Sequence, residues 1–368
     1  MKYCSRCLTP DTRPRVVFTE GVCNACLWAD KKEKIDWADR NLKLRIICET
    51  FKERARKIGN PYDVLVGVSG GKDGSYVAWK MKHEFGMNPL CVTFSPPMQT
   101  ELGRTNLDNF RASGFDLIEI RPNPEVYRQL CRRMFIEQGR VKFPFVIGIQ
   151  TAVAQMAIAY DIPFIMGGEE GETEYGGENK HESEDFMTVD YMRNIYHEGN
   201  DLSEYLDEFN RNDIHWWIAP PAEVFENFSY TWWSKWESWD DKLHADLAVR
   251  NCGLELSDGE VGTFTNYAQL DDALQDLHMY ECFLKFGFGR ATADCNLAIK
   301  AGRMSRKKAV QTIKDQDGIF PIKYLGQYCV FLRMNESEFW QVIDTHANKD
   351  ILLRTSTTMR PWILKDTI

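Results

Sequence analysis

A short glycine-rich stretch, Ser69-Gly70-Gly71-Lys72-Asp73-Gly74-Ser75, carries the residue types that bind phosphate. It follows the apolar run at 63–68, which predicts a buried strand, and precedes residues 76–85, whose spacing predicts a helix. Glycines let backbone N–H groups approach an anion closely, and a helix N-terminus adds partial positive charge. The stretch therefore predicts a nucleotide-binding loop, although the same glycines could serve only a tight turn.

The spacing of this loop excludes a Walker A motif. That motif has four residues between its first glycine and Gly-Lys, followed by Ser or Thr. Here only three residues separate Gly67 from Gly71, and Asp73 follows Lys72.

Carboxylates follow the predicted strand at 162–166, in the sequence Gly167-Gly-Glu169-Glu170. Beside a bound nucleotide such side chains could hold Mg²⁺ between phosphates, and they could also simply face water. We favour a site role for Glu169 or Glu170.

A third loop follows the predicted strand at 89–94. Its first residues, from Phe94, are expected to contact an adenine through the backbone, and Arg104 and Asn106 are its polar candidates for substrate binding. Proline and glycine fix the path of this loop.

Four cysteines have the spacing of a structural zinc site. Cys4 and Cys7 are separated by two residues, as are Cys23 and Cys26, with fifteen residues between the pairs. Four thiolates close a tetrahedral shell around Zn²⁺ and leave no open position for catalysis. Two disulfides are the alternative, but they are rare in cytoplasmic proteins.

The elements between these motifs predict an α/β fold with a doubly wound parallel sheet, because strands and helices alternate. Strands are expected at 63–68, 89–94, 115–120 and 162–166. Ligands bind such sheets at the carboxyl ends of the strands, where the three loops would converge. We expect a zinc ribbon at 1–34, a connecting helix at 35–60, the nucleotide-binding domain at 61–210 and a mostly helical region at 211–368.

Composition limits the classes of function. With 368 residues and 43% apolar residues the chain is globular, and a net charge of −9 argues against a main role in nucleic-acid binding. We find no apolar run of membrane-spanning length and no signal peptide, so a cytoplasmic protein without membrane contact is expected.

Aromatic residues gather between 216 and 239, including Trp216, Trp217, Trp232, Trp233 and Trp239. They could stack on a sugar or base, pack inside the protein, or form a partner interface, and we favour packing or an interface. Helices are expected at 270–286, with acidic residues in the first turn, and at 293–301 and 305–314.

The C-terminal part contains the string Lys285-Phe-Gly-Phe-Gly-Arg290-Ala-Thr-Ala-Asp294. A basic residue and a glycine pair before a helix suit an anion, although a helix–helix corner needs only the glycines. With Ile299-Lys-Ala-Gly-Arg303 this string, the cysteine quartet and the 69–75 loop resemble the N-acetyl sugar amidotransferases of bacterial surface-glycan assembly, of the WbpG and PseA type. The 69–75 loop itself resembles the PP-loop of the ATP pyrophosphatases, whose fold is HUP-like. Gly74 departs from most PP-loops, which have Ser there.

The resemblance implies that ATP adenylates the oxygen of a sugar acetamido group, pyrophosphate leaves, and ammonia attacks to give an acetamidino group. The sugar would be nucleotide-linked and destined for O-antigen lipopolysaccharide or flagellin glycan, as in pseudaminic acid pathways. Ser69, Gly70, Gly71, Gly74 and Ser75, with Phe94 and Gly167, are the ATP and pyrophosphate residues that it implies. Lys72, Asp73, Glu169 and Arg290 would be catalytic, with Asp73 on Mg²⁺, and Arg104, Asn106, Glu170, Lys285 and Asp294 are substrate candidates.

No glutaminase is evident in this chain, because Cys4 belongs to the predicted zinc quartet. The resemblance implies ammonia from separate subunits like the glutamine amidotransferase pair of histidine biosynthesis. The rival interpretation is a PP-loop enzyme that thiolates tRNA. Such enzymes use a basic RNA-binding face and further cysteines, and Cys131 leaves that rival open.

Overall fold

The computed structural model describes residues 1–199, 202, 208–259, 261–268 and 270–366. Its centre is a five-stranded sheet in the order β5-β4-β3-β6-β7, in which every neighbouring pair is parallel. The strands are β3 (Val64–Gly67), β4 (Pro89–Phe94), β5 (Asp116–Ile120), β6 (Phe164–Gly167) and β7 (Ser229–Trp232). The doubly wound α/β prediction is confirmed.

The fifth strand, β7, comes from beyond residue 210, where we expected the nucleotide-binding domain to end. It pairs with β6 from Phe164↔Ser229 to Gly167↔Trp232. Polar and aromatic residues alternate in Ser229-Tyr-Thr-Trp232, which is typical of a strand, but we assigned them to the tryptophan cluster and predicted no strand there.

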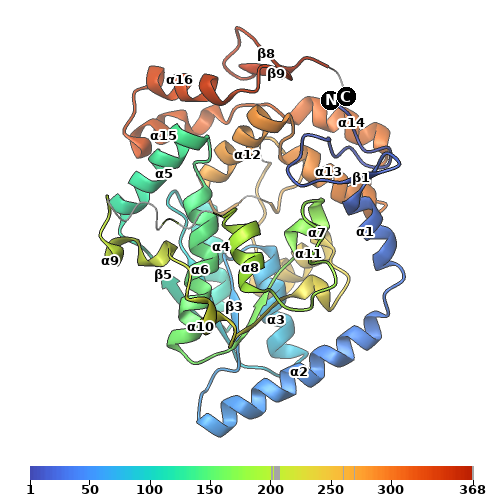
Figure 1. Ribbon diagram of the computed structural model, residues 1–368, viewed down its shortest axis with the longest axis vertical. Coiled ribbons are helices and arrows are strands. Elements are labelled where there is room, and N and C mark those ends of the chain that lie inside the picture. The colour runs from blue at the N-terminus through green and yellow to red at the C-terminus, as the bar shows by residue number, and fades with distance from the viewer. Residues whose placement is uncertain (200–201, 203–207, 260, 269, 367–368) are drawn as a thin grey trace.

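Helices cover both faces of the sheet (Figure 1). Side chains alternate along β3, so Leu65 faces one hydrophobic core while Val64 and Val66 face the other. The first core contains α5 (Pro124–Gln138) and α6 (Phe143–Ala159), and the second contains α2 (Trp37–Ile58), α3 (Lys72–His83), α4 (Glu101–Ala112) and α11 (Asp241–Cys252).

Most of the tryptophan cluster belongs to these cores. Trp217 and Trp233 are fully buried, and Trp232 and Trp236 are nearly so. Trp217 packs edge-on against Phe94, and Trp233 packs edge-on against Tyr76. Interior packing is therefore the role of these four side chains, and only Trp239 reaches a cavity described below.

The C-terminal region is mainly helical, as expected. It contains α12 (Ala273–Phe286), α13 (Arg290–Lys300), α14 (Arg306–Gln316), α15 (Leu325–Leu332) and α16 (Glu336–His346), followed by the hairpin β8 (Leu352–Arg354) and β9 (Trp362–Leu364). Short helices lie between the sheet strands: α7 (Gly171–Tyr175), α8 (Val189–Tyr191), α9 (Arg211–Ile214) and α10 (Ala222–Phe225).

Two helix starts differ from the sequence prediction. α12 begins at Ala273 because Asp272 caps it, accepting a hydrogen bond from Leu274 N at 3.0 Å. α13 begins at Arg290, three residues earlier than expected. The buried Asp317 carboxylate accepts from Gly289 N and from the Thr292 hydroxyl, and so satisfies donors at this helix start.

The N-terminal unit has the hairpin β1 (Phe18–Thr19) and β2 (Val22–Cys23), followed by α1 (Asn24–Lys32). It lies beside α13 and α14, which come from a distant part of the sequence, whereas α2 passes below the sheet in the view of Figure 1. Among the described residues no helix combines the length and apolar character that crossing a bilayer would require.

Candidate active site

The glycine-rich loop connects β3 to α3 and lies against the start of α4. Gly70 has a φ of +83°, and a Cβ there would lie 2.5 Å from the backbone nitrogen of Leu107. Only glycine fits this approach. At the N-cap, Gly71 offers no side chain to the first N–H groups of α3, so these donors remain available to an anion.

Gly74, the departure from most PP-loops, is explained by packing. A Cβ on Gly74 would lie 2.8 Å from the carbonyl oxygen of Gly67 and 2.9 Å from Cα of Val68. The first turn of α3 therefore sits directly on the end of β3, and this chain has no room for a serine.

A cavity of about 230 Å³ opens at the carboxyl end of β3, as expected for this kind of sheet. Its lining joins the loop to the start of α4, the segment after β6, and the C-terminal region. The lining residues are Ser69, Gly70, Gly71, Lys72, Asp73, Gly74, Gly103, Asn106, Glu169, Tyr175, Tyr267, Ala268, Leu270, Asp271, Gln275 and Arg290.

Asp73 is held by three side chains. Trp239 Nε1 donates to Oδ1 at 3.0 Å, His244 Nδ1 lies 2.8 Å from the same oxygen, and the Lys72 ammonium pairs with Oδ2. Burial alone would raise the pKa of Asp73, but the charge of Lys72 and the hydrogen bond from His244 outweigh it and lower that pKa. Asp73 is therefore a fixed carboxylate at the edge of the cavity.

Glu169 differs from Asp73 in its electrostatics. Burial and the nearby charge of Asp73 raise the pKa of Glu169 to about 7. Burial alone would lower the pKa of Lys72, but the negative charges of Asp73 and Glu169 outweigh burial and raise it. The cavity thus contains a fixed cation beside two carboxylates, one of which can exchange a proton near neutral pH.

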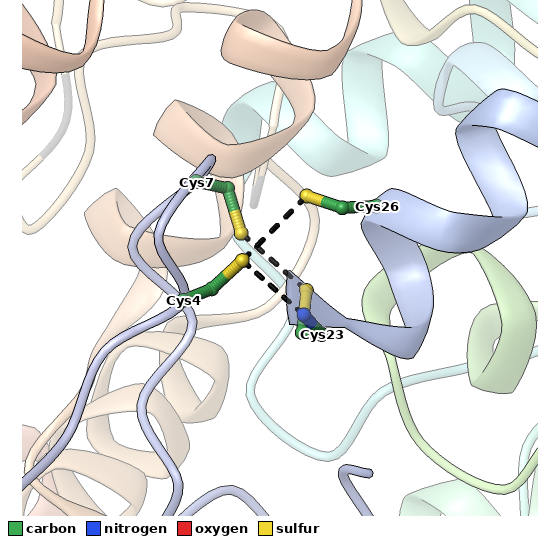
Figure 2. Close-up of side chains that lie close together, drawn as sticks. All are labelled: Cys4, Cys7, Cys23 and Cys26. Carbon is green, nitrogen blue, oxygen red and sulfur yellow. Dashed lines mark hydrogen bonds between the residues drawn. The ribbon is translucent and has the colours of Figure 1, made fainter. Parts of the chain in front are cut away.

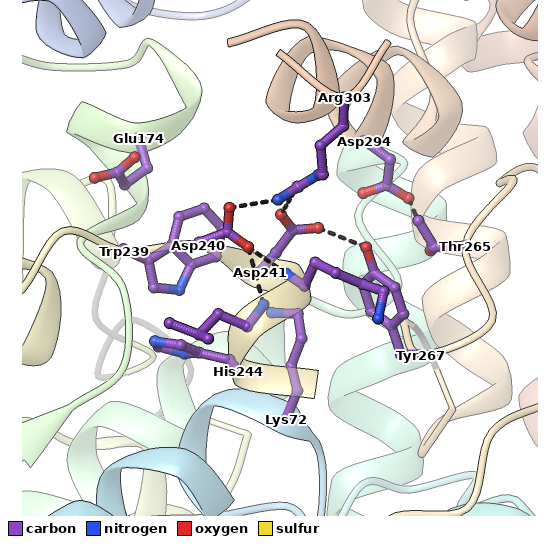
Figure 3. Close-up of polar contacts among 12 residues, drawn as sticks. Lys72, Glu174, Trp239, Asp240, Asp241, His244, Thr265, Tyr267, Asp294 and Arg303 are labelled. Carbon is purple, nitrogen blue, oxygen red and sulfur yellow. Dashed lines mark hydrogen bonds and ion pairs between the residues drawn. The ribbon is translucent and has the colours of Figure 1, made fainter. Parts of the chain in front are cut away.

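Arg290 enters the cavity from the first residue of α13. Its Nε lies 2.8 Å from Asp294 Oδ1, one helical turn later. The other oxygen of Asp294 accepts from the Thr263 hydroxyl at 2.5 Å and lies 3.3 Å from that of Thr265 (Figure 3). Asp294 lies behind Arg290 and orients it, and is not itself part of the lining.

Five other predicted residues lie away from this lining. Arg104 forms ion pairs with Asp108 and Glu119, and Lys285 donates to Gln138 O. Glu170 is buried as the N-cap of α7, accepting from Glu172 N and Thr173 N. Phe94 packs in the core and Gly167 lies against Trp232.

Asn106 and Ser75 were predicted as ligand-binding side chains. Asn106 lines the cavity, but its amide pairs with the backbone of Glu255, donating to the carbonyl at 3.0 Å and accepting from the N–H at 2.7 Å. Ser75 is fully buried beside the loop, and its hydroxyl has no hydrogen-bond partner among the described residues.

Sequence reasoning missed several lining or supporting residues. Tyr175, Tyr267, Gln275 and His244 carry no motif of their own and reach the site from distant segments. Asp271, in the acidic first turn of the helix expected at 270–286, was not predicted as a site residue but lines the cavity. The sequence signal that could have indicated them was Trp239, the last member of the aromatic cluster. His244 follows it by little more than one helical turn, and both side chains contact Asp73.

The four cysteines form a single cluster (Figure 2). Their sulfur atoms lie within 4.8 Å of one another, with Cys4 and Cys26 at 3.9 Å and Cys7 and Cys23 at 3.5 Å. Tetrahedral Zn–S bonds of about 2.3 Å require sulfur atoms roughly 3.8 Å apart, so these residues fit a zinc ion. Cys4 also accepts from Cys23 N at 3.3 Å, a hydrogen bond that suits a thiolate.

The N-terminal unit of β1, β2 and α1, which holds the four cysteines and is called the cysteine unit below, contacts two helices that line the cavity. Asn296 on α13 accepts from Leu8 N at 2.8 Å and donates to Thr9 Oγ1 at 2.9 Å. Trp28 on α1 donates to Glu174 on α7 at 3.0 Å. The unit therefore fixes the two helices that carry Arg290 and Tyr175 into the cavity.

Residues 261–364 match the family described as "LPS biosynthesis protein WbpG-like, C-terminal domain". This match includes the Lys285–Asp294 string, and it confirms the WbpG-type resemblance for this part of the chain. A comparison with curated proteins finds no match.

Two solved structures are similar at low levels. One is a predicted subunit of tRNA methyltransferase from Methanocaldococcus jannaschii, with 14% identity, a TM-score of 0.30, and coverage of 60% of this chain and 86% of that one. The other is NMN synthetase from Francisella tularensis, with 14% identity, a TM-score of 0.29, and coverage of 61% and 89%.

Proposed function

We propose that this chain, whose residues 261–364 form a WbpG-like C-terminal domain, is an ATP-dependent amidotransferase acting on a nucleotide-linked acetamido sugar. One observation carries the proposal. The phosphate-binding loop and Arg290 of the WbpG-like domain line the same cavity. The part of the chain that suits ATP and the part that is specific to the WbpG-like proteins therefore meet at one place.

The reaction needs an activated amide, because an amide carbonyl is a poor electrophile. The acetamido oxygen attacks the α-phosphate of ATP, a P–O bond breaks and pyrophosphate leaves. The lone pair of ammonia then forms a C–N bond, and the C–O bond breaks as AMP departs with the former amide oxygen. The product is a protonated acetamidino group, and no protein nucleophile takes part.

Catalysis of this kind depends on positioning and charge. Backbone N–H groups of Gly70 and Gly71, with Ser69, would bind the departing pyrophosphate, and Lys72 would neutralise its charge. Arg290 would bind the acetamido sugar or its developing adenylate from the opposite wall.

Asp73 and Glu169 supply the oxygen ligands that Mg²⁺ prefers, and these residues would hold the magnesium that accompanies ATP. The metal would neutralise phosphate charge. If Asp73 alone holds the metal and Glu169 stays free of it, the raised pKa of Glu169, about 7, suits it instead to accept a proton from the attacking ammonia.

Ammonia would be delivered by separate glutaminase subunits, like the glutamine amidotransferase pair that the resemblance implies. The family description places relatives in lipopolysaccharide biosynthesis, and we propose a place in O-antigen or flagellin-glycan assembly, in the cytoplasm, where nucleotide sugars are made.

A panel of nucleotide-linked acetamido sugars tests the proposal. Purified protein with ATP, Mg²⁺ and ammonium chloride should form AMP and pyrophosphate only with the correct sugar, whose mass should fall by about 1 Da as C=O becomes C=NH. Formation of ADP, or AMP without a modified sugar, would contradict it. Asp73→Asn is the matched inactive control.

The tRNA-thiolation alternative receives no support from the cavity, since no cysteine is among its lining residues. Cys131, which left that alternative open, is fully buried in the hydrophobic core. Burial raises the pKa of this thiol well above its ordinary value, opposite to what a nucleophile requires.

A further inference from the structure

A second cavity, of about 370 Å³, adjoins the first and has no role in the chemistry described so far. It lies between α1 of the cysteine unit, α7, α13 and the 238–241 segment. Its lining is Ala25, Ala29, Lys32, Glu33, Trp37, Glu174, Ser238, Trp239, Asp240, Asp241, Leu297, Lys300 and Ala301.

Side chains that line the two cavities contact one another, and Figure 3 shows Asp241 hydrogen-bonded to Tyr267. Trp239 lines the second cavity while its indole N–H holds Asp73 in the first. Asp241 lines the second and accepts at 2.8 Å from the hydroxyl of Tyr267, which lines the first. Tyr175, also in the first, has its ring centre 6.0 Å from that of Trp239.

The charge of the second cavity favours a small cation. Four carboxylates line it, against the two amines of Lys32 and Lys300. Lys32 is already paired with Glu174 at 2.8 Å, and burial lowers the pKa of Lys300. Asp240 and Asp241 pair with Arg303, which leaves an acidic balance even when Arg303 is counted.

The aromatic residues of the cavity suit the same ligand. Trp37 and Trp239 present indole rings, which attract ammonium groups through their π faces. The Lys72 ammonium already lies 5.3 Å from the centre of the Trp239 ring. An ammonium ion in the second cavity would meet the same ring and the Asp240 and Asp241 carboxylates.

We propose that this second cavity binds ammonium and is the entrance by which the nucleophile reaches the catalytic cavity past Trp239, the ion giving up one proton to water so that neutral ammonia enters and attacks. The inference rests on the proposed function for its use of ammonia. It gives this second cavity, which the phosphate chemistry leaves unused, a role in delivering the nucleophile. ATP and the sugar occupy the first cavity, and the nucleophile arrives from the second.

Plugging the entrance tests the proposal. Ala301 is exposed and lines the second cavity, so Ala301→Trp narrows it without touching the catalytic residues. We expect the KM for ammonium to rise at least tenfold while sugar-dependent exchange of pyrophosphate into ATP, which needs no ammonia, stays within twofold of wild type. Ala112→Trp, an equivalent change at the exposed end of α4, should alter neither. An unchanged KM for ammonium in Ala301→Trp would overturn the proposal.

A second measurement does not depend on activity. Thallium(I) resembles ammonium in charge and size, and its anomalous scattering locates it in crystals soaked in thallium(I) acetate. We expect a site between Trp239 and the carboxylates of Asp240 and Asp241 that disappears in Ala301→Trp. No thallium site there would overturn the proposal. A wild-type protein that binds thallium there but shows no exchange with any sugar would instead contradict the proposed function alone.

Discussion

Asp73 shows how the catalytic loop depends on residues distant in sequence. Its carboxylate orientation is set by Trp239 and by His244, whose buried ring also stacks on Tyr76 at 3.7 Å between ring centres. His244 touches no expected substrate and acts as a positioning residue.

Replacing His244 with alanine should lower kcat for pyrophosphate exchange by about 10- to 100-fold, the usual cost of losing an outer hydrogen-bond partner of a catalytic ligand. His244→Asn keeps an N–H donor near the position of Nδ1 and should recover part of the rate. The KM for ATP should change little in either variant. Equal exchange rates in wild type and His244→Ala would show that Asp73 needs no such support.

Gly74 provides a second test at the residue scale, because family preference and local packing disagree. Gly74→Ser restores the residue of most PP-loops but places its Cβ against Gly67 O and Val68 Cα. We expect a loss of about 1–3 kcal/mol in the free energy of unfolding, the range for overpacked sites, measured by urea denaturation. Gly326→Ser, at an exposed helix position with no atom within 4 Å of a built Cβ, should stay within about 1 kcal/mol of wild type. A Gly74→Ser protein as stable as Gly326→Ser would disprove the packing argument.

At the scale of elements, the cysteine unit acts as an external brace on α7 and α13. Removing the zinc ion that the cysteines are expected to hold, with a chelator or by Cys26→Ser, should abolish exchange activity and raise hydrogen exchange in 290–300 and 171–175. Amides of β3 and β6 should remain protected, since the sheet packs independently of the unit. Metal analysis should find one zinc per chain in wild type. Four oxidised cysteines without zinc would contradict the prediction that a metal site stabilises α7 and α13.

The start of α13 should carry a pH signature. Burial raises the pKa of Asp317 to about 6, although hydrogen bonds from Thr292 and Gly289 oppose the shift. The folded protein therefore binds a proton that the unfolded chain releases near its ordinary pKa of about 4. The contribution of Asp317 to stability is complete below pH 4 and declines as pH rises through 6.

We expect the unfolding free energy of wild type minus that of Asp317→Asn to fall by roughly 2–3 kcal/mol between pH 4 and pH 7. Subtracting the variant cancels the titration of the cysteine unit and other carboxylates. Urea denaturation at several pH values measures the difference. A difference that stays constant, or grows with pH, would show that Asp317 is not a protonated group in the fold.

At the scale of the whole molecule, the α/β part and the C-terminal region close the cavity between them. Gln99 and Asp272 form an antiparallel bridge, Thr100 N donates to Asp271 O at 3.1 Å, and Ala273 N donates to Met98 O at 2.9 Å. A Cβ on Gly103 would lie 2.4 Å from Asp271 Cα, so the two parts touch at backbone distance. This contact brings Asp271 and Gln275 to the loop.

Local patterns explain what the sequence could predict. The strand before Ser69, the turn glycines and the cysteine spacing are properties of short segments, and the loop, the sheet and the cluster followed from them. The far wall of the cavity depends on tertiary contacts. Tyr175 and Tyr267 lie on segments without periodicity, and β7 completes the sheet from residues that resembled a packing cluster. Glu170 shows the opposite error, because its local acidic motif predicted a site residue, whereas its side chain caps α7.

In the proposed reaction ATP activates the acetamido oxygen, so the fate of that oxygen distinguishes this chemistry from simple hydrolysis of ATP. The nucleotide-linked sugar, labelled with ¹⁸O in its acetamido carbonyl, would be incubated with the protein, ATP, Mg²⁺ and ammonium. Mass spectrometry of the nucleotide product should find one ¹⁸O atom in the phosphate of AMP and none in pyrophosphate. Unlabelled AMP, or ¹⁸O retained in the sugar while ATP is consumed, would contradict the account.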